Sequence, residues 1–286
     1  MKSLFCLTTA FIAVVCMSCG KEACDKLISF KAEDASAGVL TRVEAVTLSN
    51  LESFNVLAAL SGSYVYRWTA ETVSKEGSTY TLDKYWPASD PGYCFAASNG
   101  PLGIVDGDYS FVNVADMSTD IVAAASGPAS YKAAAILSFR HILARVGGCR
   151  VEGDSCELSD IGISITPAVS GKYVIGGGSN PSRAPGSWYE SSTGPAVLLN
   201  WTSGPGFTDN GIYMIPGTYT LSFSWTAEGP TPSGGYVVQH NTGTADVLFT
   251  EGTVTNMTVS LGLETTVPVV SVSTSSWIPN NVIETF

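Results

Sequence analysis

The chemistry that stands out near the N-terminus is that of a single thiol, Cys19. Lys2 precedes an uncharged apolar run from Leu4 to Met17, and small residues flank Cys19 before polar sequence begins. The run holds about 14 residues, whereas a membrane-spanning helix needs about 20, so it predicts a cleaved secretory signal. A small residue before Cys and polar sequence after it is typical of a bacterial lipobox. The thiol would then carry a diacylglycerol and become the first mature residue, and several acyl chains on it would make a lasting membrane anchor.

Two other interpretations of this region stay open. A lipobox usually has Leu three residues before its Cys, and this chain has Cys16 there. Cleavage before Cys16 is disfavoured because the preceding Val15 is bulky. Cys19 as one half of a disulfide is the structural alternative.

The cysteines of the mature sequence favour disulfide chemistry over a metal site. Besides the acylated one they are Cys24, Cys94, Cys149 and Cys156. Cys149 and Cys156 flank an acidic turn at residues 152–154, so one hypothesis is a disulfide that staples a hairpin. Zinc is disfavoured because the mature sequence has no Cys-x-x-Cys pair, and His141 and His240 are the only histidines.

The sequence contains no recognisable catalytic constellation. It has no Gly-x-Ser-x-Gly motif, and the Gly-rich stretch at residues 176–181 has no Lys and ends in Pro, which indicates a loop and not a phosphate cradle. His141 lies in an apolar stretch, where a satisfied core or interface histidine is expected. Asp106 and Asp108 lack the further acidic ligands of a dedicated calcium site. We therefore expect no catalytic residue, no cofactor and no metal.

Three aromatic residues offer a different kind of site. Trp188, Tyr189 and Trp201 lie in or beside Gly-rich stretches, where exposed rings would suit stacking on sugars. Packing in a core is the commoner fate of such rings. These residues motivate an alternative function, a glycan-binding surface lipoprotein of a nutrient-uptake system.

The composition is typical of a secreted β-rich protein. Of 286 residues, 45% are hydrophobic and 14% are charged, and Gly is abundant. The chain has 14 basic and 25 acidic residues; without Lys2 the balance is 13 minus 25, or −12. Because this charge repels phosphates, nucleic acid is excluded as a partner.

Alternating patterns predict strands along most of the chain. The clearest expected strands are 26–31, 43–48, 54–60, 63–68, 79–85, 93–97, 219–225, 257–263 and 267–272. Ala133–Val146 is ambiguous, because its alanine content favours a helix while alternation from Leu137 to Leu143 favours a strand. We expect a signal peptide (1–18) followed by two β-sandwich domains, 19–155 and 156–286.

A series of landmarks in this order resembles a known family. They are Cys19, Leu27–Phe30, Thr41-Arg42, Phe54–Ala58, Tyr85–Pro87 with Tyr93–Ala96, Leu137–Val146 and, in the second half, Ile215–Leu221. Together they resemble the fimbrillin-like lipoproteins, the fimbrial subunits of anaerobic Gram-negative bacteria. This resemblance implies two tandem transthyretin-like β-sandwich domains, and a strand for Ala133–Val146.

The resemblance also implies a mechanism. Subunits of this kind reach the outer membrane as lipoproteins, an Arg-directed protease removes the lipidated first strand, and a strand from another subunit fills the emptied groove. On this sequence the cut would follow Arg42, and the plug side chains would be Leu27, Ile28 and Phe30. The expected partners are other fimbrial subunits, the membrane through the lipid, and a surface ligand bound in adhesion. Arg42 as an ordinary solvated residue, in an uncleaved anchor or tip protein, stays open.

Overall fold

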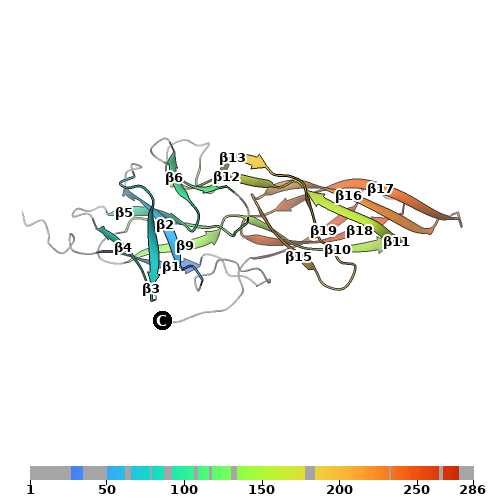
Figure 1. Cartoon of the computed structure of the whole chain (residues 1–286), viewed down its shortest axis with the longest axis horizontal. Coiled ribbons are helices and arrows are strands. Elements are labelled where there is room, and N and C mark those ends of the chain that lie inside the picture. Colours follow the sequence, from blue (N-terminus) through green and yellow to red (C-terminus); the bar gives the residue numbers. More distant parts are fainter. Residues whose placement is uncertain are drawn as a thin grey trace, which may run out of the picture.

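The computed structural model describes residues 27–34, 50–61, 66–77, 79–86, 92–105, 109–115, 118–129, 134–177, 184–231, 233–263 and 267–276. All regular secondary structure in these ranges is β-strand, which confirms the expected all-β class. The strands form two units that lie end to end in an elongated molecule (Figure 1).

The first unit is a closed barrel. Its strands, in ring order, are β1 (Leu27–Asp34), β4 (Thr79–Tyr85), β3 (Glu71–Glu76), β2 (Ser53–Leu60), β5 (Tyr93–Ser98), β8 (Val122–Ala125) and β9 (Ala135–His141). The strand β1 closes the ring, because it pairs antiparallel with β4 on one side and parallel with β9 on the other. A sandwich with two separate sheets is expected from the sequence, whereas here β1 joins all seven strands into one closed barrel.

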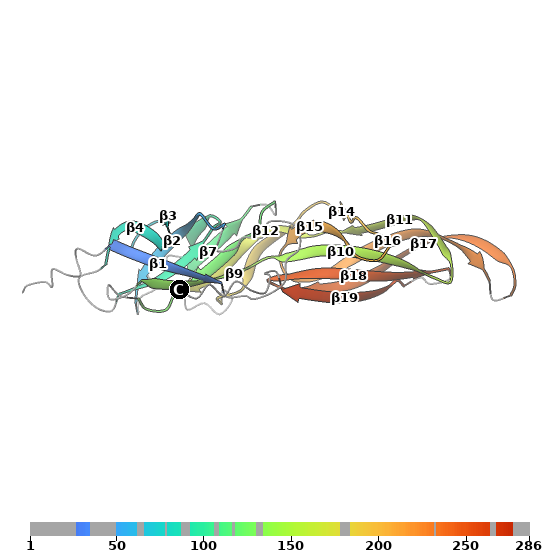
Figure 2. The same cartoon turned by 90° about the horizontal axis from the view of Figure 1, so that it is seen from below.

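The second unit is a sandwich of two four-stranded sheets. One sheet has the order β15 (Thr208–Met214), β10 (Ala144–Asp154), β18 (Thr253–Gly262) and β19 (Val269–Ser276); the other has β14 (Val197–Leu198), β11 (Glu157–Ile165), β16 (Gly217–Pro230) and β17 (Tyr236–Phe249). Apolar residues from both sheets share one core, which includes Trp225, Phe249 and Met257. The long hairpin of β16 and β17 lies at the end of the molecule that is remote from the barrel (Figure 2).

A fourth sheet connects the two units. Its order is β13 (Trp188–Thr193), β12 (Ala168–Gly177), β7 (Tyr109–Val114) and β6 (Leu102–Val105). It combines strands from both halves of the sequence, since β12 pairs with β7. A third core contains residues of this sheet together with Leu57 and Ala96 of the barrel and Val254 of the sandwich. Apolar side chains of both units are therefore buried together in this third core.

The chain passes from the first unit to the second between β9 and β10, at Ile142 and Leu143. The strand β10 pairs with β15 and β18, which belong to the second sandwich. The expected boundary after residue 155 lies in the turn from β10 to β11, and both of these strands belong to the second sandwich. We therefore propose that the boundary lies at Ile142–Leu143, with β12 and β13 returning to the first unit.

Alternation in the sequence agrees with burial in β9 and β16, each of which has one exposed face. In β16, Leu221, Phe223 and Trp225 are buried and the intervening serines are exposed. The ambiguous stretch Ala133–Val146 contains β9, in which every second residue is buried, so the strand interpretation is confirmed. At residues 63–68, by contrast, the described part contains only an isolated bridge at Tyr66.

The predicted disulfide between Cys149 and Cys156 is wrong. Cys149 pairs with Met257 on β18, whereas the thiol of Cys156 contacts the carbonyl of Leu261, four positions further along that strand. Four strand positions span about 13 Å, and bridged cysteines need Cα atoms within about 7 Å. The described cysteines, Cys94, Cys149 and Cys156, are all free.

Alkylation should distinguish these thiols. Burial raises the pKa of the Cys149 thiol to about 11, and two pKa units correspond to about a hundredfold smaller thiolate fraction. We expect iodoacetamide at pH 8 to leave Cys149 unmodified in the folded protein and to modify it in denaturant, as peptide mass spectrometry would show. A mass 2 Da below that of the reduced chain, with Cys149 and Cys156 both unmodified in denaturant, would contradict the free thiols.

Candidate functional site

The strand β1 is the candidate site, because the two pairings that close the barrel both run through it. Its first half lies antiparallel to β4, from Leu27 opposite Tyr85 to Phe30 opposite Tyr80. Its second half lies parallel to β9, from Phe30 opposite Ala135 to Asp34 opposite Phe139. Phe30 is paired with both β4 and β9, so the barrel is closed through the backbone of this residue.

The side chains of β1 alternate between the barrel core and the outside. Ile28 and Phe30 are completely buried, and Ala32 is partly buried against the same core. Leu27 is 45% exposed, so its predicted role as a plug side chain is not supported. The cause is the two-residue period of a strand, which puts Leu27 on the outer face when Ile28 faces the core.

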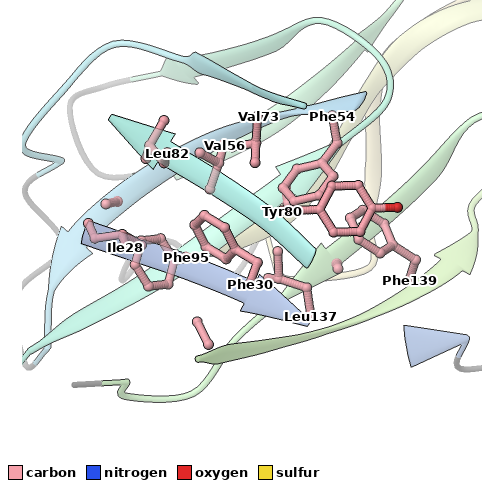
Figure 3. Close-up of a cluster of buried hydrophobic side chains, with 14 of the residues drawn as sticks. Ile28, Phe30, Phe54, Val56, Val73, Tyr80, Leu82, Phe95, Leu137 and Phe139 are labelled. Atoms are coloured by element: carbon pink, nitrogen blue, oxygen red, sulfur yellow. The ribbon is translucent and has the colours of Figure 1, made fainter. Parts of the chain in front are cut away.

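An aromatic cluster surrounds Phe30. Its ring makes edge-to-face contacts with Phe54 and Phe95, with centroids 5.8 and 5.0 Å away. Phe54 in turn contacts Tyr80 and Phe139. Figure 3 shows Ile28 and Phe30 projecting from β1 into this cluster. Such ring pairs stabilise a core by about 0.5–1.5 kcal/mol each beyond the burial of their area.

Loss of β1 would change the barrel in two ways. The edges of β4 and β9 that face β1 would lose their backbone hydrogen-bond partners, and unpaired sheet edges are templates for another strand. The side chains around Ile28 and Phe30 would face an open apolar slot. An incoming strand satisfies both the backbone groups and the slot at once.

The residues predicted to be acylated and cleaved lie before and after β1 in the sequence, outside the described ranges. Cys19 precedes residue 27, and Arg42 falls within residues 35–49, between β1 and β2. Their acylation and cleavage therefore remain predictions. What the structure describes is the strand that lies between these two positions in the sequence.

The three aromatic residues predicted for sugar stacking do not form one platform. The ring of Trp188 lies 5.1 Å from that of Tyr173, and Tyr189 makes an edge contact with Phe111, both in the sheet that connects the units. Trp201 packs against the second core, and its indole N–H donates to the carbonyl of Ile161. All three are partly buried by these contacts, so packing accounts for their positions.

Sequence reasoning missed a polar network at the junction of the units. The Arg140 guanidinium on β9 donates to the Tyr173 hydroxyl at 2.5 Å and lies 3.6 Å from the Glu251 carboxylate. The Tyr173 hydroxyl donates to Glu251 at 3.1 Å. Burial raises the pKa of Tyr173, and it also raises that of Glu251 despite the nearby Arg140. These residues are far apart in sequence, so no local motif marks them.

His141 is buried, in agreement with the expected core or interface histidine. Its Nδ1 lies 2.8 Å from a carboxylate oxygen of Asp120, and both side chains are 1% exposed. Asp120 lies just before β8, so this pair fixes the end of β9 within the first unit. The buried Arg145 forms an ion pair with Asp209 that joins β10 to β15 within the second unit. The pairing of Arg140 with Glu251 is what connects the end of β9 to the second unit.

Among the residues that the structure describes, no group of three or more His, Cys, Asp or Glu side chains is placed to hold a metal ion. No helix in the described ranges is long and apolar enough to cross a membrane.

Comparison with known proteins supports the fold. No protein-family profile and no curated protein sequence matches the chain. A fimbrial protein from Bacteroides vulgatus superposes with a TM-score of 0.52 at 12% identity, over 88% of this chain and 100% of the other. A protein described as a candidate cell adhesion protein from Bacteroides eggerthii gives 0.55 at 12% identity, over 90% and 98%. The chain shares the fold of these two proteins. The resemblance found in the sequence is thus confirmed at the level of the fold.

The contribution of β1 to stability can be measured with a matched pair of substitutions. Ile28→Ala should lower the free energy of unfolding by about 2–5 kcal/mol, because it empties a buried site. Leu27→Ala, one residue away on the outer face, should change it by less than about 0.5 kcal/mol. Urea unfolding followed by tryptophan fluorescence would report both. Equal losses for the two variants would contradict the inward and outward assignment.

The junction network should respond to pH. Because its pKa is raised in the folded state, Glu251 binds its proton more tightly there than in the unfolded chain. The stability that this proton contributes is present at pH values below the unfolded pKa and is lost as pH rises through the folded one. We expect the wild type to lose stability relative to Glu251→Gln between pH 4 and pH 7 in urea unfolding. A constant difference between the two proteins would contradict this.

Proposed function

We propose that the chain is a non-enzymatic surface subunit of fimbrial type whose first strand is exchanged for a strand of another subunit. The observation that carries the proposal is the position of β1, which comes first among the described strands and lies between β4 and β9. Arg42 follows it in the sequence, before β2 begins. A cut after Arg42 would leave β1 attached to the barrel through noncovalent contacts alone.

The lipid anchor and the strand would then lie on the same fragment. Residues 20–26 separate the acylated Cys19 from β1, and both precede Arg42. One cut would therefore detach the two units from the membrane and make β1 replaceable. Before the cut the protein is held at the outer membrane, and afterwards it is part of a fimbria.

An adhesive role agrees with the neighbours in fold, which are named as a fimbrial protein and a candidate cell adhesion protein. The net charge of −11 opposes binding of nucleic acid or of an anionic membrane surface. The adhesion ligand would be a component of a host or bacterial surface.

Cleavage at Arg42 should make β1 removable. We expect the purified chain, after treatment with an Arg-specific protease, to lose the fragment that ends at Arg42 during gel filtration at a urea concentration below the unfolding midpoint of the uncut protein. Arg42→Ala should keep this fragment under the same treatment, and mass spectrometry should show Val43 at the new N-terminus of the cut protein. A chain that is cut after Arg42 and retains the fragment under these conditions would reject strand exchange.

Membrane release gives an independent readout of the same cut. The intact lipoprotein should partition into a detergent phase, and the cut protein into the aqueous phase. Cys19→Ser should be aqueous before any cut, because it cannot be acylated. Aqueous partitioning of the intact wild-type chain would contradict the lipid anchor.

A further inference from the structure

We infer that the slot occupied by β1 selects its partner strand by the sizes of three side chains. The partner would carry a branched aliphatic residue at the position of Ile28, an aromatic ring at that of Phe30 and a small residue at that of Ala32. This inference rests on the proposed strand exchange and specifies the chemistry of the strand that enters.

The partner is inferred to run in the same direction as β1. The strand β1 is antiparallel to β4 and parallel to β9. A strand in the opposite direction would be parallel to β4 and antiparallel to β9, so it would not reproduce the hydrogen bonds of β1 on either side. A strand that runs as β1 does reproduces both ladders, and its residues can be compared with those of β1 one by one.

The middle position requires a ring because its neighbour on β9 is small. Phe30 lies opposite Ala135 on β9 and Tyr80 on β4, and all three are buried. The space beside Ala135 is filled by the Phe30 ring, which reaches Phe54 and Phe95. A smaller side chain would leave a cavity at this point.

The third position requires a small residue because its neighbour on β9 is large. Ala32 lies opposite Leu137, which is completely buried. Large and small residues thus alternate across the two strands, with Phe30 beside Ala135 and Ala32 beside Leu137. A bulky side chain at the third position would overpack the core.

The first position and the outer face complete the pattern. Ile28 lies opposite the buried Leu82 and is itself fully buried. On the outer face Leu27 and Lys31 are exposed and Ser29 is half-buried, so these positions tolerate substitution. Selection of the partner strand therefore depends on the side chains at the positions of Ile28, Phe30 and Ala32.

The sequence that follows β18 does not carry this combination. Between Val267 and Phe286 no aliphatic residue is followed by an aromatic two positions on and a small residue two further on. This stretch also contains Pro268 and Pro279, and proline lacks the N–H that a strand bonded on both sides must donate. We therefore take the partner to be a strand of a different protein, not the C-terminal stretch of a second copy.

Peptide exchange on the cut full-length protein tests the inference. The probes are fluorescent peptides with the sequence of Leu27–Asp34 and with the same sequence carrying Phe30→Ala and Ala32→Phe, which preserves composition. A third peptide has the sequence of residues 277–286. Fluorescence anisotropy would give the dissociation constants. We expect the exchanged peptide and the third peptide to bind at least a hundredfold more weakly than the first.

A variant of the slot provides a matched control. Leu137→Ala makes room beside the third position. It should therefore reduce the ratio of the dissociation constants of the exchanged and native peptides at least tenfold. Ala135→Gly leaves the large neighbour in place and should preserve the preference for the native peptide.

The outcomes separate the inference from the proposed function. Equal binding of the native and exchanged peptides would overturn size selection and leave strand exchange intact. Tight binding of the peptide of residues 277–286 would overturn the assignment to a different protein. Failure of every peptide to displace the cut N-terminal fragment would count against strand exchange itself.

Discussion

The parallel pairing of β1 with β9 is the interaction on which the first unit depends. It joins residues about 105 positions apart in the chain and closes a ring whose strands are otherwise paired to neighbours in one continuous order. With β1 in place neither β4 nor β9 has a free edge in the ring, which is the protection that a barrel offers against pairing with other chains. Because a single strand provides this protection, its removal exposes both edges together.

The strand β9 also connects this pairing to the rest of the molecule. It passes through Ile142 and Leu143 into β10, which lies inside one sheet of the second sandwich. Its end is fixed to the start of β8 by the buried His141–Asp120 pair and to the second unit by the pairing of Arg140 with Glu251. Buried and paired polar groups such as His141 and Asp120 favour one arrangement over alternatives. One wall of the slot is therefore built on a strand that is held at its end, and such a rigid wall would allow side-chain size to be distinguished.

The sequence predicted the periodicity of strands well and their partners poorly. The alternation in β9 and β16 is visible in the sequence because each strand buries one face. The resemblance to the fimbrillin-like family implies Leu27, Ile28 and Phe30 as plug side chains, and Ile28 and Phe30 face the core whereas Leu27 does not. The short apolar segment alone does not show which of its faces is inward. Pairing of β1 with β9, the Arg140–Tyr173–Glu251 network and the domain boundary depend on contacts between distant residues, which no local pattern encodes. The Cys149–Cys156 hypothesis failed for the same reason, because proximity in sequence was taken for proximity across a sheet.

Cleavage after Arg42 would work as a switch without altering any contact of β1. In the uncut chain residues 35–49 tether β1 to β2, and a short tether gives a bound segment an effective concentration on the order of millimolar. A competing strand in solution is far more dilute, so it occupies the slot less often than β1 even when its intrinsic affinity is equal. After the cut, β1 that dissociates is diluted into bulk solution and competes at its free concentration. Covalent continuity would therefore decide which strand occupies the slot, while the positions of Ile28, Phe30 and Ala32 would define which strands fit it.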